Sequence, residues 1–287
     1  MNNLVKNLLG TSLFLFSSFE AAYSECIQDK SATKNKVIRC ENIDYNVSVP
    51  ESCVEGSCPL VMDVHGWTMT AKDQEKNTGL AKLGQENGFI TIQPNAPRKN
   101  WSSDHYPSVY NFLKEAIDVW NVDRSRIHMT GFSQGAMMTW HFICSYSDLI
   151  ASAAPIGYHN PKEGCHGENK LNPKISILYH TGISDRLASI SDARSYSEII
   201  KEAMGFELED EIDARKYNWK YYKNEDGVDF QYVEHDYYTG LLFGRGHCFP
   251  GPANGYNKYG CRQRSDYLWG EKVMNFFASH PKLQSDD

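Results

Sequence analysis

The chain has 287 residues, of which 41% are hydrophobic and 23% are charged, and its formal net charge is −7. This composition is typical of a globular protein with a sizeable core, and the length allows one large domain or two small ones. The acidic balance and the lack of a long basic run disfavour a nucleic-acid partner.

The N-terminal segment differs from the rest of the chain. A single lysine precedes the apolar stretch Leu8–Phe16, and Ala22 and Ser24 stand at positions −3 and −1 of a candidate cleavage site. This layout predicts a secretory signal peptide over residues 1–24 and a folded domain over 25–287, secreted to the outside or to a periplasm. A membrane-anchoring N-terminus is the alternative, but the apolar stretch is too short to span a bilayer.

The cysteine content is consistent with secretion. An even number of cysteines behind a secretory signal predicts disulfides, and irregular spacing without a CxxC pair makes a zinc site improbable. The short pairings Cys53–Cys58 and Cys248–Cys261 are favoured, and the full connectivity stays open. The eight residues are Cys26, Cys40, Cys53, Cys58, Cys144, Cys165, Cys248 and Cys261.

Short apolar runs alternate with segments of helical periodicity along the rest of the chain. This alternation predicts βαβ units and a mostly parallel sheet with helices on both faces, in one domain. Segment 207–226, rich in charged and aromatic residues, is interpreted as a surface insertion. In chain order we expect strands at 46–49 and 59–64, a helix at 80–86, a strand at 89–93, a helix at 108–120, a strand at 126–132, a helix at 134–144, strands at 151–156 and 175–179, and helices at 190–204 and 267–279.

One segment has the setting of a catalytic nucleophile. Residues Gly131–Gly135 have the sequence GFSQG, which matches the pattern G-x-S-x-G. The pattern alone is weak evidence, but here a predicted strand enters it and a predicted helix leaves it, as a nucleophile elbow requires. We therefore predict Ser133 as the nucleophile of an acyl-transfer reaction; the alternative is an ordinary turn with a capping serine.

A serine hydroxyl needs a base to accept its proton, and seven histidines follow Ser133 in the sequence. After a nucleophile elbow the chain order is serine, acid, histidine, with the histidine near the C-terminus. His247 fits this order because it lies in the glycine-rich segment GRGHCFPG, before the last helix. A solvated loop histidine is the alternative interpretation.

The acid must hold and stabilise the imidazolium. Asp185 follows the predicted strand at 175–179, and catalytic groups gather beyond the carboxyl ends of such strands. Asp192 is the nearest rival, but a position at the start of a helix explains it adequately. The oxyanion of the transition state needs two N–H donors, for which we predict the amides of Gln134 and Trp67.

At this point the motifs resemble a known family, the polyhydroxybutyrate depolymerase/feruloyl esterase family of the α/β-hydrolase superfamily. The resemblance implies a single α/β-hydrolase catalytic domain, a Ser133–Asp185–His247 triad and no cofactor or metal. Members often have a cysteine where this chain has Trp67. The resemblance covers about residues 37–280 and is carried by PLVMDVHGWTMT (59–70), RIHMTGFSQGAMM (126–138), CSYSDLIASAAPIG (144–157), the turn at 180–185 and GRGHCFPG (244–251).

The resemblance further implies secretion and an ester substrate, which can be polymeric. The leading hypothesis is a feruloyl- or acetyl-type ester on plant cell-wall polysaccharide, with Trp67 and Trp101 lining the acyl site. A polyhydroxyalkanoate polyester is the alternative substrate. Less favoured are a peptidase, which can use the same triad, and a non-catalytic hydrolase fold used for binding.

Overall fold

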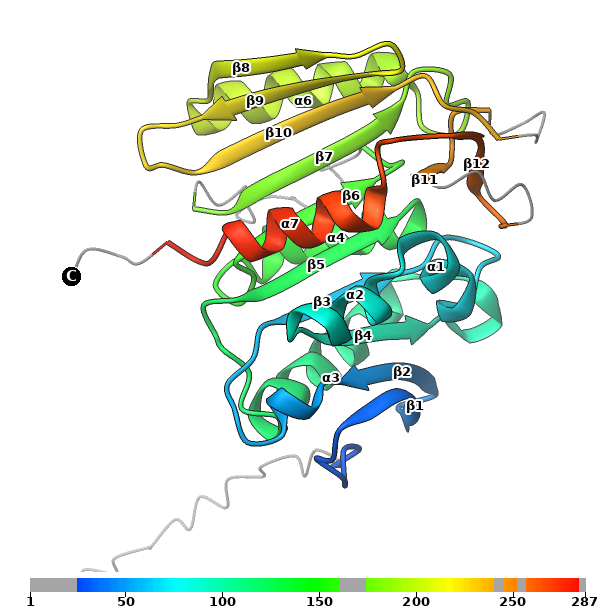
Figure 1. The fold of residues 1–287 in the computed structure, drawn as a ribbon, viewed down its shortest axis with the longest axis vertical. Coiled ribbons are helices and arrows are strands. Elements are labelled where there is room, and N and C mark those ends of the chain that lie inside the picture. The colour runs from blue at the N-terminus through cyan, green and yellow to red at the C-terminus, as the bar shows by residue number, and fades with distance from the viewer. Residues whose placement is uncertain (1–24, 160–173, 240–244, 252–256, 284–287) are drawn as a thin grey trace, which may run out of the picture.

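The computed structural model describes residues 25–159, 174–239, 245–251 and 257–283. These residues build one domain around a twisted ten-stranded sheet (Figure 1). In spatial order its strands are β1 (Thr33–Cys40), β2 (Ile43–Val49), β4 (Ile90–Asn95), β3 (Leu60–Val64), β5 (Ile127–Phe132), β6 (Ser152–Ile156), β7 (Ser176–Gly182), β10 (Asp229–His235), β9 (Tyr217–Lys223) and β8 (Glu207–Asp213).

The central strands from β4 to β10 run parallel, and the pairs at both margins of the sheet run antiparallel. A separate two-stranded sheet stands at the carboxyl ends of the parallel strands (Figure 1). Its strands are β11 (Phe249–Gly251) and β12 (Gly260–Arg264). Because parallel strands end at the same edge, the loops that follow them are brought together there.

Helices cover both faces of the sheet, as the sequence predicted. The α-helices are α1 (Ala71–Thr78), α2 (Leu80–Asn87), α3 (Tyr106–Val119), α4 (Gln134–Ser145), α6 (Ile190–Met204) and α7 (Trp269–Ser279), and the short 3-10 helices are η1 (Glu51–Cys53), η2 (Pro97–Lys99) and η3 (Ser103–His105). Figure 1 shows α1, α2 and α7 in front of the sheet and α4 and α6 behind it.

The core accordingly has two halves, one on each face of the sheet. One half joins side chains of α3, α4 and α6, such as Phe112, Trp140 and Ile200, and the other joins side chains of α2 and α7, such as Leu80 and Phe277. Strand β3 is buried at every position, as is typical of a strand covered on both faces.

The interpretation of segment 207–226 as a surface insertion is wrong. The segment contains the whole of β8 and β9, which extend the central sheet. Trp219 and Tyr222 of β9 pack into opposite halves of the core, which the high charge of the neighbouring residues concealed. Strand β1 and helix α1 were also not predicted; α1 has few apolar side chains and begins with a Thr70–Asp73 capping box.

Both favoured disulfides are confirmed, since Cys53 bonds Cys58 and Cys248 bonds Cys261. A third bond, Cys26–Cys40, ties the N-terminal arm to the end of β1, and Cys144 is disulfide-bonded as well. The predicted signal peptide lies outside the described residues. Among the residues that are described, no helix has the length and apolar character needed to cross a bilayer.

Candidate active site

Ser133 lies at the turn between β5 and α4, in an unusual backbone conformation. Its φ and ψ are 54° and −114°, a sparsely populated region for a residue with a side chain. The flanking glycines allow this turn to pack closely. A Cβ at Gly131 would lie 2.3 Å from the carbonyl oxygen of Gly135, and a Cβ at Gly135 would lie 2.1 Å from that of Val64. The geometry is therefore that of the sharp elbow that the sequence predicted.

His247 and Asp185 form a buried pair. The His247 Nδ1 atom lies 2.7 Å from Asp185 Oδ2, and their side chains are 3% and 0% exposed. The other carboxylate oxygen of Asp185 accepts the amide hydrogens of Leu187 and Ala188, at 2.8 and 2.9 Å. These bonds fix the carboxylate so that it accepts the Nδ1 hydrogen. Because Nδ1 faces Asp185, Nε2 lies on the other side of the ring and is the nitrogen that could serve as a general base.

The rival acid lies in a different environment. Asp192 is 63% exposed at its side chain, and its Oδ2 lies 3.5 Å from Nε2 of His159 rather than near His247. The structure therefore brings Asp185, and not Asp192, to the predicted base.

Ser133 and His247 meet at the same strand end. The amide of Ser133 donates to the carbonyl of Ile156, and a Cβ on the next residue, Gly157, would lie 3.3 Å from His247 Cε1. The ring of Phe132 lies 4.5 Å from that of His247. In the described part of the chain, Ser133 Oγ and His247 Nε2 form no hydrogen bond; in free enzymes this contact is often loose and tightens around substrate.

The loop after β3 approaches the nucleophile from the other side. A Cβ at Gly66 would lie 3.2 Å from the Cβ of Ser133, so the following residue, Trp67, stands next to the elbow. Gln134 begins α4, and the amides of the first helical turn have no partner within their helix. The two predicted oxyanion donors therefore flank the nucleophile on separate elements.

His65 and Trp101 hold these two elements in place. Nδ1 of His65 donates to the Gly66 carbonyl at 2.7 Å, and Nε2 accepts the amide of Ala96 at 2.9 Å. Burial lowers the pKa of His65 to about 4, so its ring is neutral and serves a structural role, as expected. The Trp101 indole donates to the His65 carbonyl at 2.9 Å, and its amide donates to Oε1 of Gln134 at 3.1 Å.

The two tryptophans predicted to line the acyl site differ in exposure. Trp67 is 59% exposed and is available to a substrate. Trp101 is only 4% exposed, because its ring packs beneath the loop that it supports. The structure therefore does not favour Trp101 as a substrate contact and gives it a positioning role instead.

Sequence reasoning missed a hollow beside the acid. A cavity of about 390 Å³ is lined by Tyr158, Leu187 and Tyr196, among others. Tyr158 follows Gly157, which contacts the His247 ring, and Leu187 follows Asp185 by two residues, so the cavity adjoins the triad. The available signal was an aromatic residue, Tyr158, two positions after the end of β6.

The sequence analysis also missed a buried carboxylate at the base of the loop after β3, which carries Trp67 and is called the oxyanion loop below. Asp63 of β3 accepts hydrogen bonds from Gln74 at 2.6 Å, Thr78 at 2.8 Å and Gln93 at 2.9 Å. Burial raises the pKa of Asp63 to about 6, although the three donors oppose that rise. A lone aspartate inside an apolar strand was the signal that pointed to such a network.

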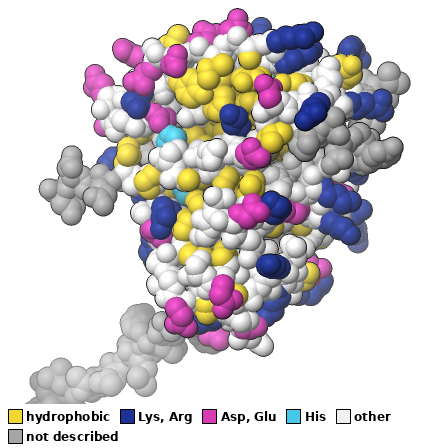
Figure 2. All heavy atoms as spheres, viewed as in Figure 1, with side chains coloured by type: hydrophobic (Ala, Val, Ile, Leu, Met, Phe, Trp, Pro, Cys, Tyr) yellow, Lys and Arg dark blue, Asp and Glu magenta, His cyan; other side chains and the backbone are white. Residues whose placement is uncertain are grey.

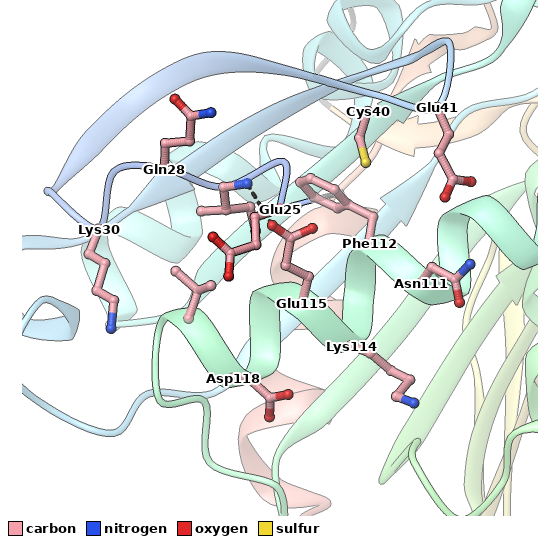
Figure 3. Close-up of a pocket in the computed structure, with 12 residues that line it drawn as sticks. Glu25, Gln28, Lys30, Cys40, Glu41, Asn111, Phe112, Lys114, Glu115 and Asp118 are labelled. Carbon is pink, nitrogen blue, oxygen red and sulfur yellow. Dashed lines mark hydrogen bonds between the residues drawn. The ribbon is translucent and has the colours of Figure 1, made fainter. Parts of the chain in front are cut away.

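A larger cavity, of about 600 Å³, lies between the N-terminal arm and α3 (Figure 3). In the described residues, one group has metal-ligand spacing, formed by Cys26, Cys40 and Glu115 near this cavity. Both sulfurs are in a disulfide and offer no thiolate, and Glu115 accepts the amide of Ile27 at 2.6 Å. The group therefore fastens the arm and is unsuited to a metal ion.

Comparisons with known proteins agree with this architecture. An acetyl xylan esterase from Aspergillus awamori superposes with a TM-score of 0.59 at 17% identity, covering 88% of this chain and 97% of the other. A thermostable esterase gives a TM-score of 0.56 at 17% identity, covering 86% and 62%. The chain has the α/β-hydrolase fold. The predicted fold class is thereby confirmed.

The relatives found by sequence match only part of the chain. No family model matches the chain. Acetylxylan esterase A of Emericella nidulans is 28% identical over 137 residues, covering 43% of this chain and 44% of the relative. A bifunctional acetylxylan esterase/xylanase of Neocallimastix patriciarum is 24% identical over 159 residues, covering 53% and 23%. The matched part of the chain thus spans less than half of either relative.

Proposed function

We propose that this protein is a carboxylic ester hydrolase that uses Ser133 as nucleophile, His247 as base and Asp185 as the orienting acid. The observation that carries the proposal is the buried His247–Asp185 pair, which stands at the strand end where the strained Ser133 turn also lies. Nucleophile, base and orienting acid on three separate loops of one sheet edge are the arrangement of a serine hydrolase.

The reaction is acyl transfer in two steps. Ser133 Oγ attacks the ester carbonyl carbon while His247 Nε2 takes the hydroxyl proton, and the C=O electrons move onto the oxygen. When the carbonyl re-forms, the bond to the alcohol breaks and the alcohol leaves with the proton from His247. Water then attacks the acyl-enzyme by the same route, giving the carboxylic acid and free Ser133.

The negative charge of both tetrahedral intermediates needs donors that are already in place. The amides of Gln134 and Trp67 flank Ser133 and supply them, with Trp101 and His65 holding the loop. A donor fixed by the fold does not have to reorganise during the reaction, and one such donor contributes about 2.7–4 kcal/mol of transition-state stabilisation.

Acetyl esters of plant polysaccharide are the proposed substrates, since the relatives described above carry the name acetylxylan esterase. We also propose that the protein is secreted after removal of residues 1–24, in keeping with its disulfides. Feruloyl esters and polyhydroxyalkanoates remain predictions of the sequence resemblance and belong in the same assay.

The test is hydrolysis of p-nitrophenyl acetate, acetylated xylan, methyl ferulate and a polyhydroxybutyrate suspension. Ser133→Ala is expected to lower kcat on the first substrate by about 10⁴-fold or more. The matched control is Ser191→Ala, which removes an exposed serine hydroxyl on α6 and should leave activity unchanged. An unaffected Ser133→Ala variant would overturn the triad, and a wild type inert toward all four would overturn the esterase assignment.

A further inference from the structure

Charge is distributed unevenly along the sequence. Acidic residues outnumber basic ones by seven in the whole chain (36 against 29), yet segments 94–103 and 245–264 contain six Lys or Arg and no Asp or Glu. These segments also carry Trp101 and His247, so both contribute to the candidate active site.

Two of these cations are fixed to the oxyanion loop. The ammonium of Lys258 donates to the carbonyl of Thr68 at 2.7 Å, and the amide of Thr68 donates to the carbonyl of Lys99 at 2.8 Å. Thr68 directly follows Trp67, one of the two proposed oxyanion donors. The adjacent Tyr259 hydroxyl lies 3.1 Å from Thr68 Oγ1. The Lys258 ammonium is therefore bonded to the residue next to Trp67, and the backbone of Lys99 is bonded to that same residue.

The backbone that carries them is strained. Arg98 and Lys99 are consecutive residues with φ values of 55° and 58°, and Tyr259, beside Lys258, has a φ of 66°. A left-handed residue with a side chain is unfavourable, and such strain persists where the surrounding structure imposes it, often at ligand sites. These loops thus hold Arg98 and Lys99 in a fixed conformation at a local energetic cost.

Within the described residues, four cations near the candidate active site lack an ion pair with a carboxylate. Among the described residues, Arg98, Lys99, Arg245 and Lys258 form no ion pair, and the Arg245 guanidinium lies 5.2 Å over the Tyr238 ring. Elsewhere in the described residues some cations are paired, as Arg39 is with Asp44 and Arg194 is with Glu234, and others, such as Lys34, form no ion pair.

The space-filling view shows the result. In Figure 2, Lys and Arg side chains gather along the side of the molecule where Figure 1 places β11 and β12, and Asp and Glu gather near β8. On a protein of net charge −7, this cluster of cations makes the local charge at the active-site edge positive.

We propose that the ester cleaved at Ser133 is carried by an anionic glycan, an acylated oligosaccharide with uronic-acid carboxylates near the ester group. The inference rests on the proposed function and specifies its substrate. Carboxylates on the sugar chain would meet Arg98, Lys99, Arg245 and Lys258 at the rim while the acyl group reaches Ser133. A neutral glycan would gain nothing from this charge.

The experiment compares two acetylated xylo-oligosaccharides of equal length, with and without a glucuronic acid side group. At low salt, kcat/KM for the acidic substrate is expected to be about tenfold higher. The advantage should shrink toward unity as NaCl is raised to about 0.5 M, because salt screens exposed charges. p-Nitrophenyl acetate, which is small and neutral, reports whether the esterase itself is active.

Charge variants locate the effect. Arg98→Gln and Arg245→Gln are each expected to lower the acidic-to-neutral ratio by about threefold or more. The control Lys34→Gln removes the same charge from an exposed position on β1, at the far margin of the sheet, and should leave the ratio unchanged. A ratio near one in an enzyme active on p-nitrophenyl acetate would overturn this inference alone, and so would equal losses in all three variants. Inactivity on every ester would overturn the proposed function.

Discussion

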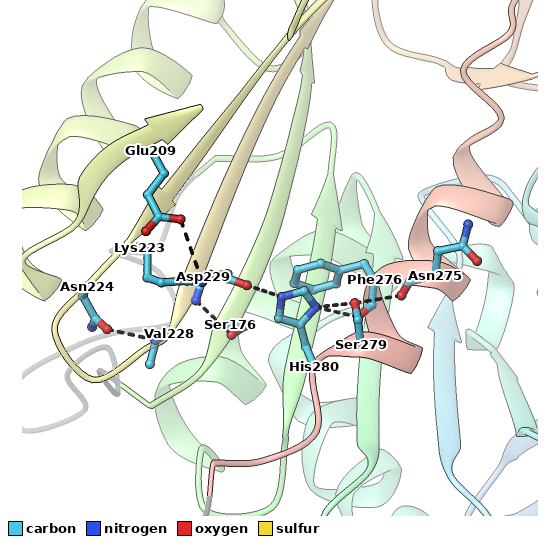
Figure 4. Close-up of polar contacts among 10 residues, drawn as sticks. All are labelled: Ser176, Glu209, Lys223, Asn224, Val228, Asp229, Asn275, Phe276, Ser279 and His280. Atoms are coloured by element: carbon cyan, nitrogen blue, oxygen red, sulfur yellow. Dashed lines mark hydrogen bonds and ion pairs between the residues drawn. The ribbon is translucent and has the colours of Figure 1, made fainter. Parts of the chain in front are cut away.

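Two aspartate–histidine pairs lie at opposite ends of the sheet, and they differ in what the second ring nitrogen does. At the carboxyl end, His247 gives Nδ1 to Asp185 and keeps Nε2 for a substrate-side proton. At the other end, Nε2 of His280 lies 2.5 Å from Asp229 and Nδ1 lies 2.7 Å from the Phe276 carbonyl (Figure 4). Both nitrogens of His280 therefore face acceptors.

This difference distinguishes His247, the proposed catalytic base, from His280, which has a structural role. Both ring nitrogens of His280 are engaged by groups of the protein, so neither is available to a substrate. His280 ties the end of α7 to the start of β10, where Lys223 also lies 3.3 Å from Asp229. Distance alone does not distinguish the two pairs; the free nitrogen of His247 and the strained serine beside it support the proposal that His247 and Asp185 are the catalytic pair.

The strongest test of this comparison is the same substitution, aspartate to asparagine, at Asp185 and at Asp229. Asp185→Asn is expected to lower kcat on p-nitrophenyl acetate by about 10⁴-fold, because the amide cannot hold the required tautomer. Asp229→Asn should retain activity within about threefold, since it lies at the other end of the strands. Steady-state kinetics on both variants checks this, and similar losses in the two would erase the distinction.

A smaller effect, on stability, is expected from substitution of His280. His280→Ala should lower the free energy of unfolding by about 1–2 kcal/mol, through the loss of its two hydrogen bonds at a site that is 12% exposed. His247→Ala provides the contrast, with lost activity. Urea unfolding and initial rates measured on both variants test this difference. A His280→Ala variant that is stable but inactive would contradict the structural role of His280.

The smallest effect concerns pH. Burial alone would raise the pKa of Asp229, but the hydrogen bonds and charges of His280 and Lys223 outweigh it and lower that pKa. A lowered carboxyl pKa contributes stability above its ordinary value of about 4 and loses it as the pH falls. The difference in unfolding free energy between wild type and Asp229→Asn should therefore shrink when urea titrations are repeated from pH 6 down to pH 3. A difference that grows toward pH 3 would contradict this sign.

The sequence by itself determined the local features of this protein. The turn at Ser133 depends on two glycines and on the strand and helix that adjoin it, all within residues 127–145. The bonds Cys53–Cys58 and Cys248–Cys261 close short loops. Chain order was enough to propose His247, and apolar periodicity predicted α6 over its full length.

Tertiary structure alone decided what depends on distant segments. Burial makes Trp101 a support instead of a substrate contact, because its indole reaches a carbonyl 36 residues away. The sheet recruited β8 and β9 through pairing with β10 and through the core on either face, although their sequence is strongly charged. Asp185 and Asp192 differ by seven positions, and only the packing of the His247 loop against the end of β7 selects between them. Such choices rest on long-range packing and burial, to which local sequence patterns contribute little.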